Sequence, residues 1–107
     1  MELERYSFVL LRRGSQADRF SGEELEQLQA AHLSHLAAMS DRGVMPVAGP
    51  FSEQPDETMR GFCLYNVELE EARRLAESDP SVQAGRLAID VFNWWTKRGA
   101  LKFGNPE

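Results

Sequence analysis

Four segments of the chain are dense in branched and aromatic residues, a pattern that favours β-strands. They read RYSFVLLR at 5–12, VMPVAG at 44–49, RGFCLYNV at 60–67 and RLAIDVFNWW at 86–95. Pro46 has no backbone N–H to donate. The second segment is therefore expected at a sheet edge, or with its proline at a strand end.

The pattern between the first two strands predicts a long helix over about 22–42, after a polar loop at 13–20. Ser21 and Glu24 have the spacing of a capping box, in which each side chain accepts a hydrogen bond from the other residue's backbone N–H. Gly43 fits the left-handed residue that commonly ends a helix.

A second, shorter helix is expected over 68–78, where acidic residues come first and arginines follow, an order that suits the helix dipole. Asp79-Pro80 interrupts it, and 81–85 fits one further turn. The resulting order, β-α-β-β-α-β, predicts an α+β fold of the ferredoxin-like type, a four-stranded antiparallel sheet with two helices on one face. We expect one domain over 1–107, with its core at about 5–97 and a tail at 98–107.

The predicted strands carry large apolar groups on both sides. In the first strand Tyr6, Phe8 and Leu10 point one way, whereas Val9 and Leu11 point the other. Two short helices cover only one face, and a half-exposed antiparallel sheet should alternate apolar with polar residues. The second apolar face therefore predicts a homodimer in which the sheets of two subunits pack together.

The amino-acid composition argues against some classes of binding partner. The 107 residues carry 12 Lys and Arg against 17 Asp and Glu, for a formal net charge of -5. Because phosphate contacts need a dense cationic patch, neither nucleic acid nor an anionic membrane surface is an expected partner. One cysteine excludes an internal disulfide and a multi-thiolate zinc site. With an acidic N-terminal segment and no long apolar run, we expect a cytoplasmic protein.

The first predicted helix carries both histidines. Its apolar stripe is formed by Leu25, Leu28, Leu36 and Met39. His32 lies in the middle of this stripe and should face the sheet, either as a core histidine with satisfied nitrogens or as an acid and base. His35 lies toward the edge, at the surface or rim. A metal site is not expected, because no third ligand stands near the two.

Asp79 has two compatible interpretations. Followed by Pro80, it fits the N-cap of a helix, and its carboxylate could also orient the imidazole of His32. Gly49, Pro50 and Phe51 fit either a tight turn or backbone exposed toward a ligand. Arg60 fits a solvated charge or a contact to an anionic substrate, and Cys63 fits a buried small apolar residue.

These residues together give the chain a likeness to a known family. From about 6 to 95 it resembles the YciI-like proteins (YCII-related domain) of the dimeric α+β barrel superfamily. The matching pieces are 32–36, Gly43, 48–51, 60–61, 71–72, 78–80 and 84–85. The resemblance implies a dimer, and a site between sheet and helices built on His32 and Asp79. It implies no particular reaction, since related barrels differ in their chemistry.

The hypothesis is an enzyme of the lyase or isomerase type that needs no metal or organic cofactor. His32 would move a proton on a small, cyclic or aromatic, weakly acidic substrate, while Asp79 holds the imidazole. The expected substrate-binding residues are Gly49, Pro50, Phe51 and Arg60. The alternative is a non-catalytic dimeric domain that binds a small molecule or serves as an accessory to another protein.

Overall fold

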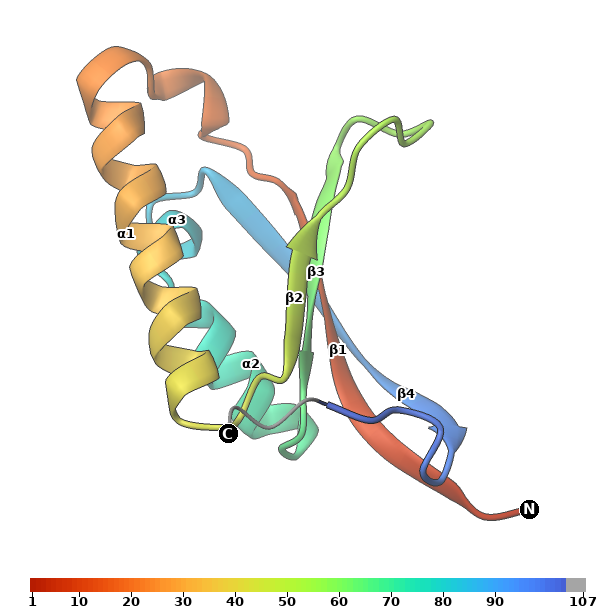
Figure 1. The fold of residues 1–107 in the computed structure, drawn as a ribbon. Helices are drawn as coiled ribbons and strands as arrows, with labels where there is room; N and C mark the ends of the chain where they lie inside the picture. The colour runs from red at the N-terminus through yellow and green to blue at the C-terminus, as the bar shows by residue number, and fades with distance from the viewer. Residues whose placement is uncertain (104–107) are drawn as a thin grey trace.

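The computed structural model describes residues 1–103 and contains one four-stranded antiparallel sheet with its helices on a single face (Figure 1). The elements are β1 (Leu3–Arg13), the short 3-10 helix η1 (Ala17–Arg19), α1 (Gly22–Asp41), β2 (Val47–Pro50), β3 (Met59–Tyr65), α2 (Leu69–Glu77), α3 (Pro80–Gln83) and β4 (Leu87–Lys97). The strand order is β2-β3-β1-β4. Within the described residues, no helix combines the length and the apolar composition needed to cross a bilayer.

The predicted α+β, ferredoxin-like arrangement is confirmed. Every predicted strand and helix is present, and the expected further turn after Asp79-Pro80 is α3. β2 is an edge strand and begins after Pro46, so the missing N–H interrupts no ladder. Of the predicted tail, 104–107 lie outside the described residues.

The start of α1 differs from the prediction. Ser21 is the N-cap residue, but its side chain makes no capping hydrogen bond, so the capping box with Glu24 is wrong. The first helical residue, Gly22, has a φ of 56°, which changes the direction in which the chain enters the helix. The other end is as predicted, because Gly43 has a φ of 76° directly after the helix.

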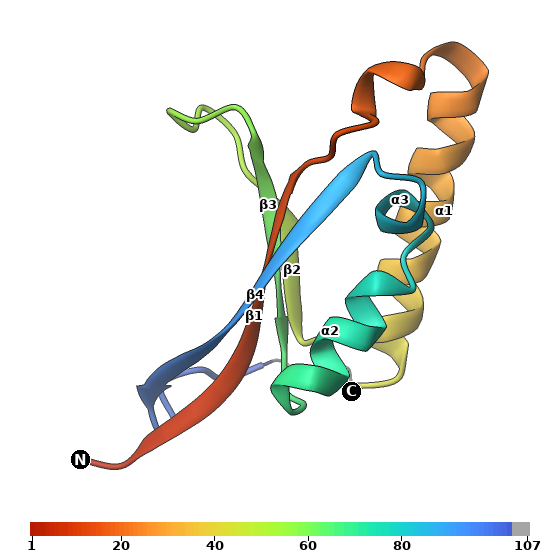
Figure 2. The same ribbon diagram turned by 180° about the vertical axis from the view of Figure 1, so that it is seen from behind.

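The apolar core lies between the sheet and the helices. Alternate residues of β1 and β3 face the helices, among them Val9 and Cys63, which are almost completely buried. The helices contribute Met39, Leu75 and other small or flexible apolar side chains. In both views α1, α2 and α3 lie on this side of the sheet (Figure 1 and Figure 2), so the core is a single layer of side chains between sheet and helices.

The other face of the sheet carries aromatic rings, and no helix of residues 1–103 covers it. Phe8 stacks on Phe62 and Phe92, with ring centroids 4.8 and 5.2 Å apart. Phe92 and Trp94 are 45% and 39% exposed. Residues paired directly across antiparallel strands share a face, and Phe8 pairs with Phe92. The two-sided apolar pattern expected from the sequence is therefore present.

Candidate active site

The site centres on a histidine and an aspartate that are 47 residues apart. His32 lies in the middle of α1 on the side facing the sheet, and only 8% of it is exposed. Asp79, at the start of α3, is 2% exposed. The Nδ1 atom of His32 is 2.5 Å from the Oδ2 atom of Asp79. The structure thus brings together the two residues expected to carry the chemistry.

The local fold at α3 explains the position of the carboxylate. Asp79 is the N-cap residue and Pro80 is the first residue of the helix. The Oδ1 atom of Asp79 accepts a hydrogen bond of 2.9 Å from the backbone N–H of Ser81, which leaves Oδ2 for His32. The capping and orienting roles coexist, and both oxygens of this buried carboxylate have a partner.

The pairing determines which ring nitrogen of His32 faces a ligand. A carboxylate accepts hydrogen bonds, so Nδ1 carries the hydrogen and donates it to Asp79. The neutral imidazole then has its lone pair on Nε2. His32 lines a cavity. Its Nε2 atom is not a buried atom without a hydrogen-bond partner, unlike the Nε2 atom of His35. Nε2 is the atom left to accept a proton from a bound molecule.

The cavity beside His32 has a volume of about 710 Å3 and lies between α1 and the sheet. This volume is in the range of roughly 300–1,000 Å3 typical of small-molecule sites. Its walls also include Gly49, Pro50, Phe51 and Arg60, all expected from the sequence to contact a substrate.

One wall of the cavity depends on a close backbone approach between β2 and β3. A Cβ atom on Gly61 would lie 2.4 Å from the carbonyl oxygen of Gly49, so any larger residue would push the two strands apart. The backbone N–H of Phe51 donates to the carbonyl oxygen of Arg60 at 2.9 Å and extends this pairing beyond β2. The tight-turn interpretation of 49–51 is therefore wrong, because Gly49 and Pro50 belong to β2 and Phe51 continues its pairing with β3, and all three residues line the cavity.

The sequence analysis missed several residues of the cavity. Arg13 and Arg86 line it, as do Asp18 and Phe20 from the loop between β1 and α1. This loop was expected only to be polar. Its backbone is fixed to the segment before β4, because the N–H of Gly14 donates to the carbonyl oxygen of Arg86 at 2.7 Å. No local sequence pattern indicates such a contact.

His35 lies outside the cavity lining and is half-buried at the edge of the α1 stripe, close to the expected rim position. Its Nε2 atom is enclosed and has no hydrogen-bond partner among the described residues. Burial lowers the pKa of His35, the negative charge of Asp79 opposes this shift, and His32 adds to it. His35 is thus a less basic neighbour of the pair rather than part of the cavity wall.

Cys63 also lines the cavity and is 2% exposed. Burial first, and the charge of Asp79 second, raise the pKa of its thiol to about 12. The thiol is therefore protonated near neutral pH and is a poor nucleophile. In residues 1–103, no three His, Cys, Asp or Glu side chains gather closely enough to hold a metal ion.

Comparison with known families assigns the class of protein. The model of the YCII-related domain family matches residues 7–95, so the chain belongs to this family. Among solved structures, it is similar to the 5-chloro-2-hydroxyhydroquinone dehydrochlorinase TftG of Burkholderia phenoliruptrix AC1100, in complex with 2,5-dihydroxybenzoquinone. The TM-score is 0.56 at 22% identity, over 82% of this chain and 92% of that one. No curated protein sequence matches.

Proposed function

We propose that the protein is an enzyme of the lyase or isomerase type that acts on a small organic molecule by proton transfer through His32. The observation that carries the proposal is the buried contact of 2.5 Å between His32 and Asp79 at the wall of a 710 Å3 cavity. A carboxylate behind an imidazole fixes its tautomer and stabilises the imidazolium that forms when Nε2 takes a proton.

The reaction needs no redox partner. The Nε2 atom of His32 accepts a proton from a C–H or O–H bond of the substrate, and the electron pair of that bond stays on the substrate. In an isomerisation the imidazolium returns the proton to another atom. In an elimination the electron pair forms a double bond, and the leaving group departs with its own bonding pair. The name of the similar protein TftG, a dehydrochlorinase, supports an elimination of this kind.

The test measures proton transfer directly. The purified protein, without added metal or organic cofactor, is incubated in D2O with a panel of cyclic enols and hydroxyquinones, and deuterium incorporation is followed by NMR. 5-Chloro-2-hydroxyhydroquinone is included, with chloride release as a second readout. We expect His32→Ala to lower the rate by about 100- to 10,000-fold, the usual contribution of a general base.

The matched control is His35→Ala, which removes the same type of side chain from the same helix but outside the cavity lining. It should leave the rate within about threefold of the wild type, as expected for a change outside the site. Saturable binding of panel compounds with no exchange or conversion would instead favour the non-catalytic binding domain. Full activity of a folded His32→Ala variant would remove the pair from the mechanism.

The active form in this proposal is a homodimer that packs its helix-free sheet faces together. The support is the row of stacked rings on that face and the 45% and 39% exposure of Phe92 and Trp94 in a single chain. Burying aromatic surface of this size gives about 25 cal/mol for each Å2 removed from water. The cavity lies on the opposite side of the sheet, so each subunit would hold its own His32 and Asp79.

A further inference from the structure

Three arginines of the cavity come together at one end of the sheet. Arg13 ends β1, Arg60 stands at the start of β3, and Arg86 directly precedes β4. The antiparallel registers, in which Leu11 pairs with Gly61 and Arg13 pairs with Leu87, place these strand ends side by side. All three arginines line the cavity, in a chain whose formal net charge is -5. The cavity therefore has a local charge opposite to that of the whole chain.

Within residues 1–103, two of these arginines have no protein acceptor for their guanidinium groups. Arg13 is paired with Asp18, the one carboxylate among the described residues that line the cavity. In the described part of the chain, no carboxylate lies within 4.0 Å of the guanidinium of Arg60 or Arg86, and neither donates a side-chain hydrogen bond. Arg60 is exposed to water, whereas Arg86 is partly buried. A partly buried cation gains more from an anionic partner than an exposed one does, because water screens it less.

The backbone of Arg86 is held on both sides. Its N–H donates to the carbonyl oxygen of Ser81 at 3.0 Å, and its carbonyl oxygen accepts from Gly14 at 2.7 Å. Gly85, with a φ of 78°, makes the turn that links α3 to Arg86. Asp79 and Arg86 therefore begin and end one short segment, and this segment places both the carboxylate behind His32 and a cation at the cavity.

We propose that the cavity selects a small conjugated organic oxyanion, such as a ring carboxylate or a deprotonated hydroxyquinone, and that Arg86 binds its negative oxygen. The planar guanidinium donates two parallel hydrogen bonds to such a group. Phe20 lines the same cavity and offers an aromatic side chain to a flat ring. Arg60 adds a weaker, water-screened attraction.

This inference deepens the function proposed above, because it names the substrate class of the same site. When His32 removes a proton from an anion, the electron pair left on the conjugated system increases its negative charge. A guanidinium already in contact with the oxygen that receives this charge stabilises the product of the proton transfer. Arg86 would then contribute to binding and to the chemical step.

The test is isothermal titration calorimetry with three probes on the folded, full-length protein. Salicylate and salicylamide form a matched pair, an anion and a neutral amide of the same ring, and 2,5-dihydroxybenzoquinone is a second anion at neutral pH. We expect Arg86→Gln to weaken binding of both anions by about 10- to 100-fold, as for loss of a hydrogen bond to a charged group. Salicylamide binding should change by no more than about twofold.

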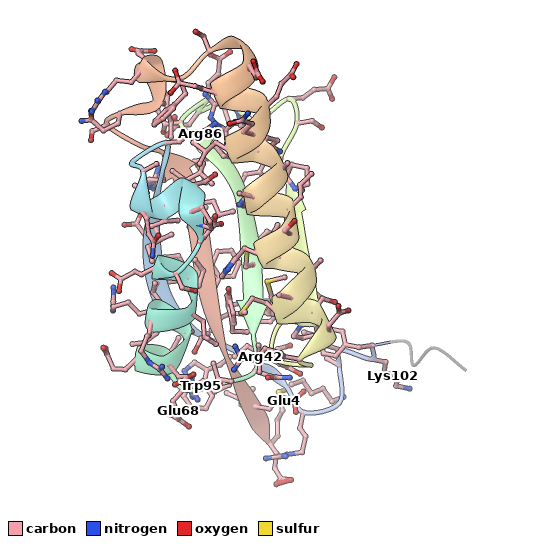
Figure 3. The ribbon with its side chains drawn as sticks, turned by 90° about the vertical axis from the view of Figure 1, so that its left-hand side faces the viewer. Glu4, Arg42, Glu68, Arg86, Trp95 and Lys102 are labelled. Carbon is pink, nitrogen blue, oxygen red and sulfur yellow. The ribbon has the colours of Figure 1, made fainter. Side chains whose placement is uncertain are left out.

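Two further variants keep the test specific. Arg86→Lys retains the charge and should recover part of the lost affinity, but not all, because an ammonium group lacks the planar pair of donors. Arg42→Gln removes an arginine charge at the C-terminal end of α1. Arg42 does not line the cavity and lies far from Arg86 in Figure 3, so this variant should change anion binding by at most about twofold. Thermal unfolding checks that each variant is folded.

The outcomes separate this inference from the proposed function. Anion binding that depends on Arg86 in wild type and in His32→Ala, with no proton exchange in either, supports the inference and contradicts the function. The inference is overturned if the wild type binds neither anion, if it binds salicylamide as tightly as salicylate, or if Arg42→Gln weakens anion binding as much as Arg86→Gln.

Discussion

The two faces of the sheet are both apolar, but only the face covered by helices also contains a buried polar pair. On the helix face, Val9 and Cys63 share a core with Met39 of α1 and Leu75 of α2, and α1 and α3 also hold a buried polar pair, His32 and Asp79. On the other face, aromatic rings stack on one another and remain partly exposed, with Phe92 at 45%. Apolar burial alone explains the second face, whereas the first contains charges that a core does not require. Buried polar groups beside a cavity thus distinguish a chemical site from a packing surface.

The largest predicted effect concerns the helix face and the residue that serves both fold and site. Asp79→Ala leaves the imidazole of His32 without its partner and removes the cap from the N–H of Ser81. An unsatisfied buried group and a lost N-cap together cost about 2–5 kcal/mol. Urea denaturation should show this loss in the free energy of unfolding, and proton exchange should fall with it.

The matched control is Asp56→Ala. Asp56 also accepts a backbone N–H, that of Thr58 at 2.9 Å, but it is exposed and has no buried histidine. Its loss should cost less than about 1 kcal/mol. The double variant of His32 and Asp79 then isolates their coupling. Equal costs for Asp79→Ala and Asp56→Ala would mean that the buried contact with His32 adds no stability.

The next effect concerns the helix-free face. Phe92→Glu places a charge among the stacked rings, and we expect it to raise the dissociation constant of the proposed dimer at least 30-fold, as for a residue worth about 2 kcal/mol at an interface. Analytical ultracentrifugation measures this change. Leu3→Glu is the control, because Leu3 is similarly exposed at 48% but lies on the opposite side of β1. A wild-type monomer at all concentrations would contradict the dimer.

The comparison of the two faces also shows which structural features could be predicted from the sequence. The fold could be predicted, because each strand has its own apolar run and Gly43 and Asp79-Pro80 mark helix ends. The burial of His32 followed from the helical stripe around it. Apolar runs, helix ends and helical stripes depend only on residues close together in the chain, so they can be recognised in a single sequence.

Features that depend on strand register could not be predicted in the same way. Arg86 directly precedes β4, and no pattern in the neighbouring sequence indicates that it lines a cavity. Its position there depends on the backbone contact with Gly14, just after β1, which follows from the pairing of β1 with β4. The capping box at Ser21 failed for a related reason, since the positive φ of Gly22 is a property of the folded chain. The chemistry of the cavity therefore becomes complete only when segments far apart in the sequence are aligned.

The smallest predicted effect tests His35, the half-buried neighbour of the pair. Its pKa is lowered from the ordinary value of 6.5, chiefly by burial, so the unfolded chain binds a proton before the folded protein does. Stability should therefore be fully present above about pH 6.5 and decline as pH falls through the lowered pKa. In urea denaturation at about pH 7.5 and about pH 5, His35→Gln should lose less stability on acidification than the wild type. If both lose the same amount, proton binding at His35 does not contribute, and the acid sensitivity arises elsewhere in the protein.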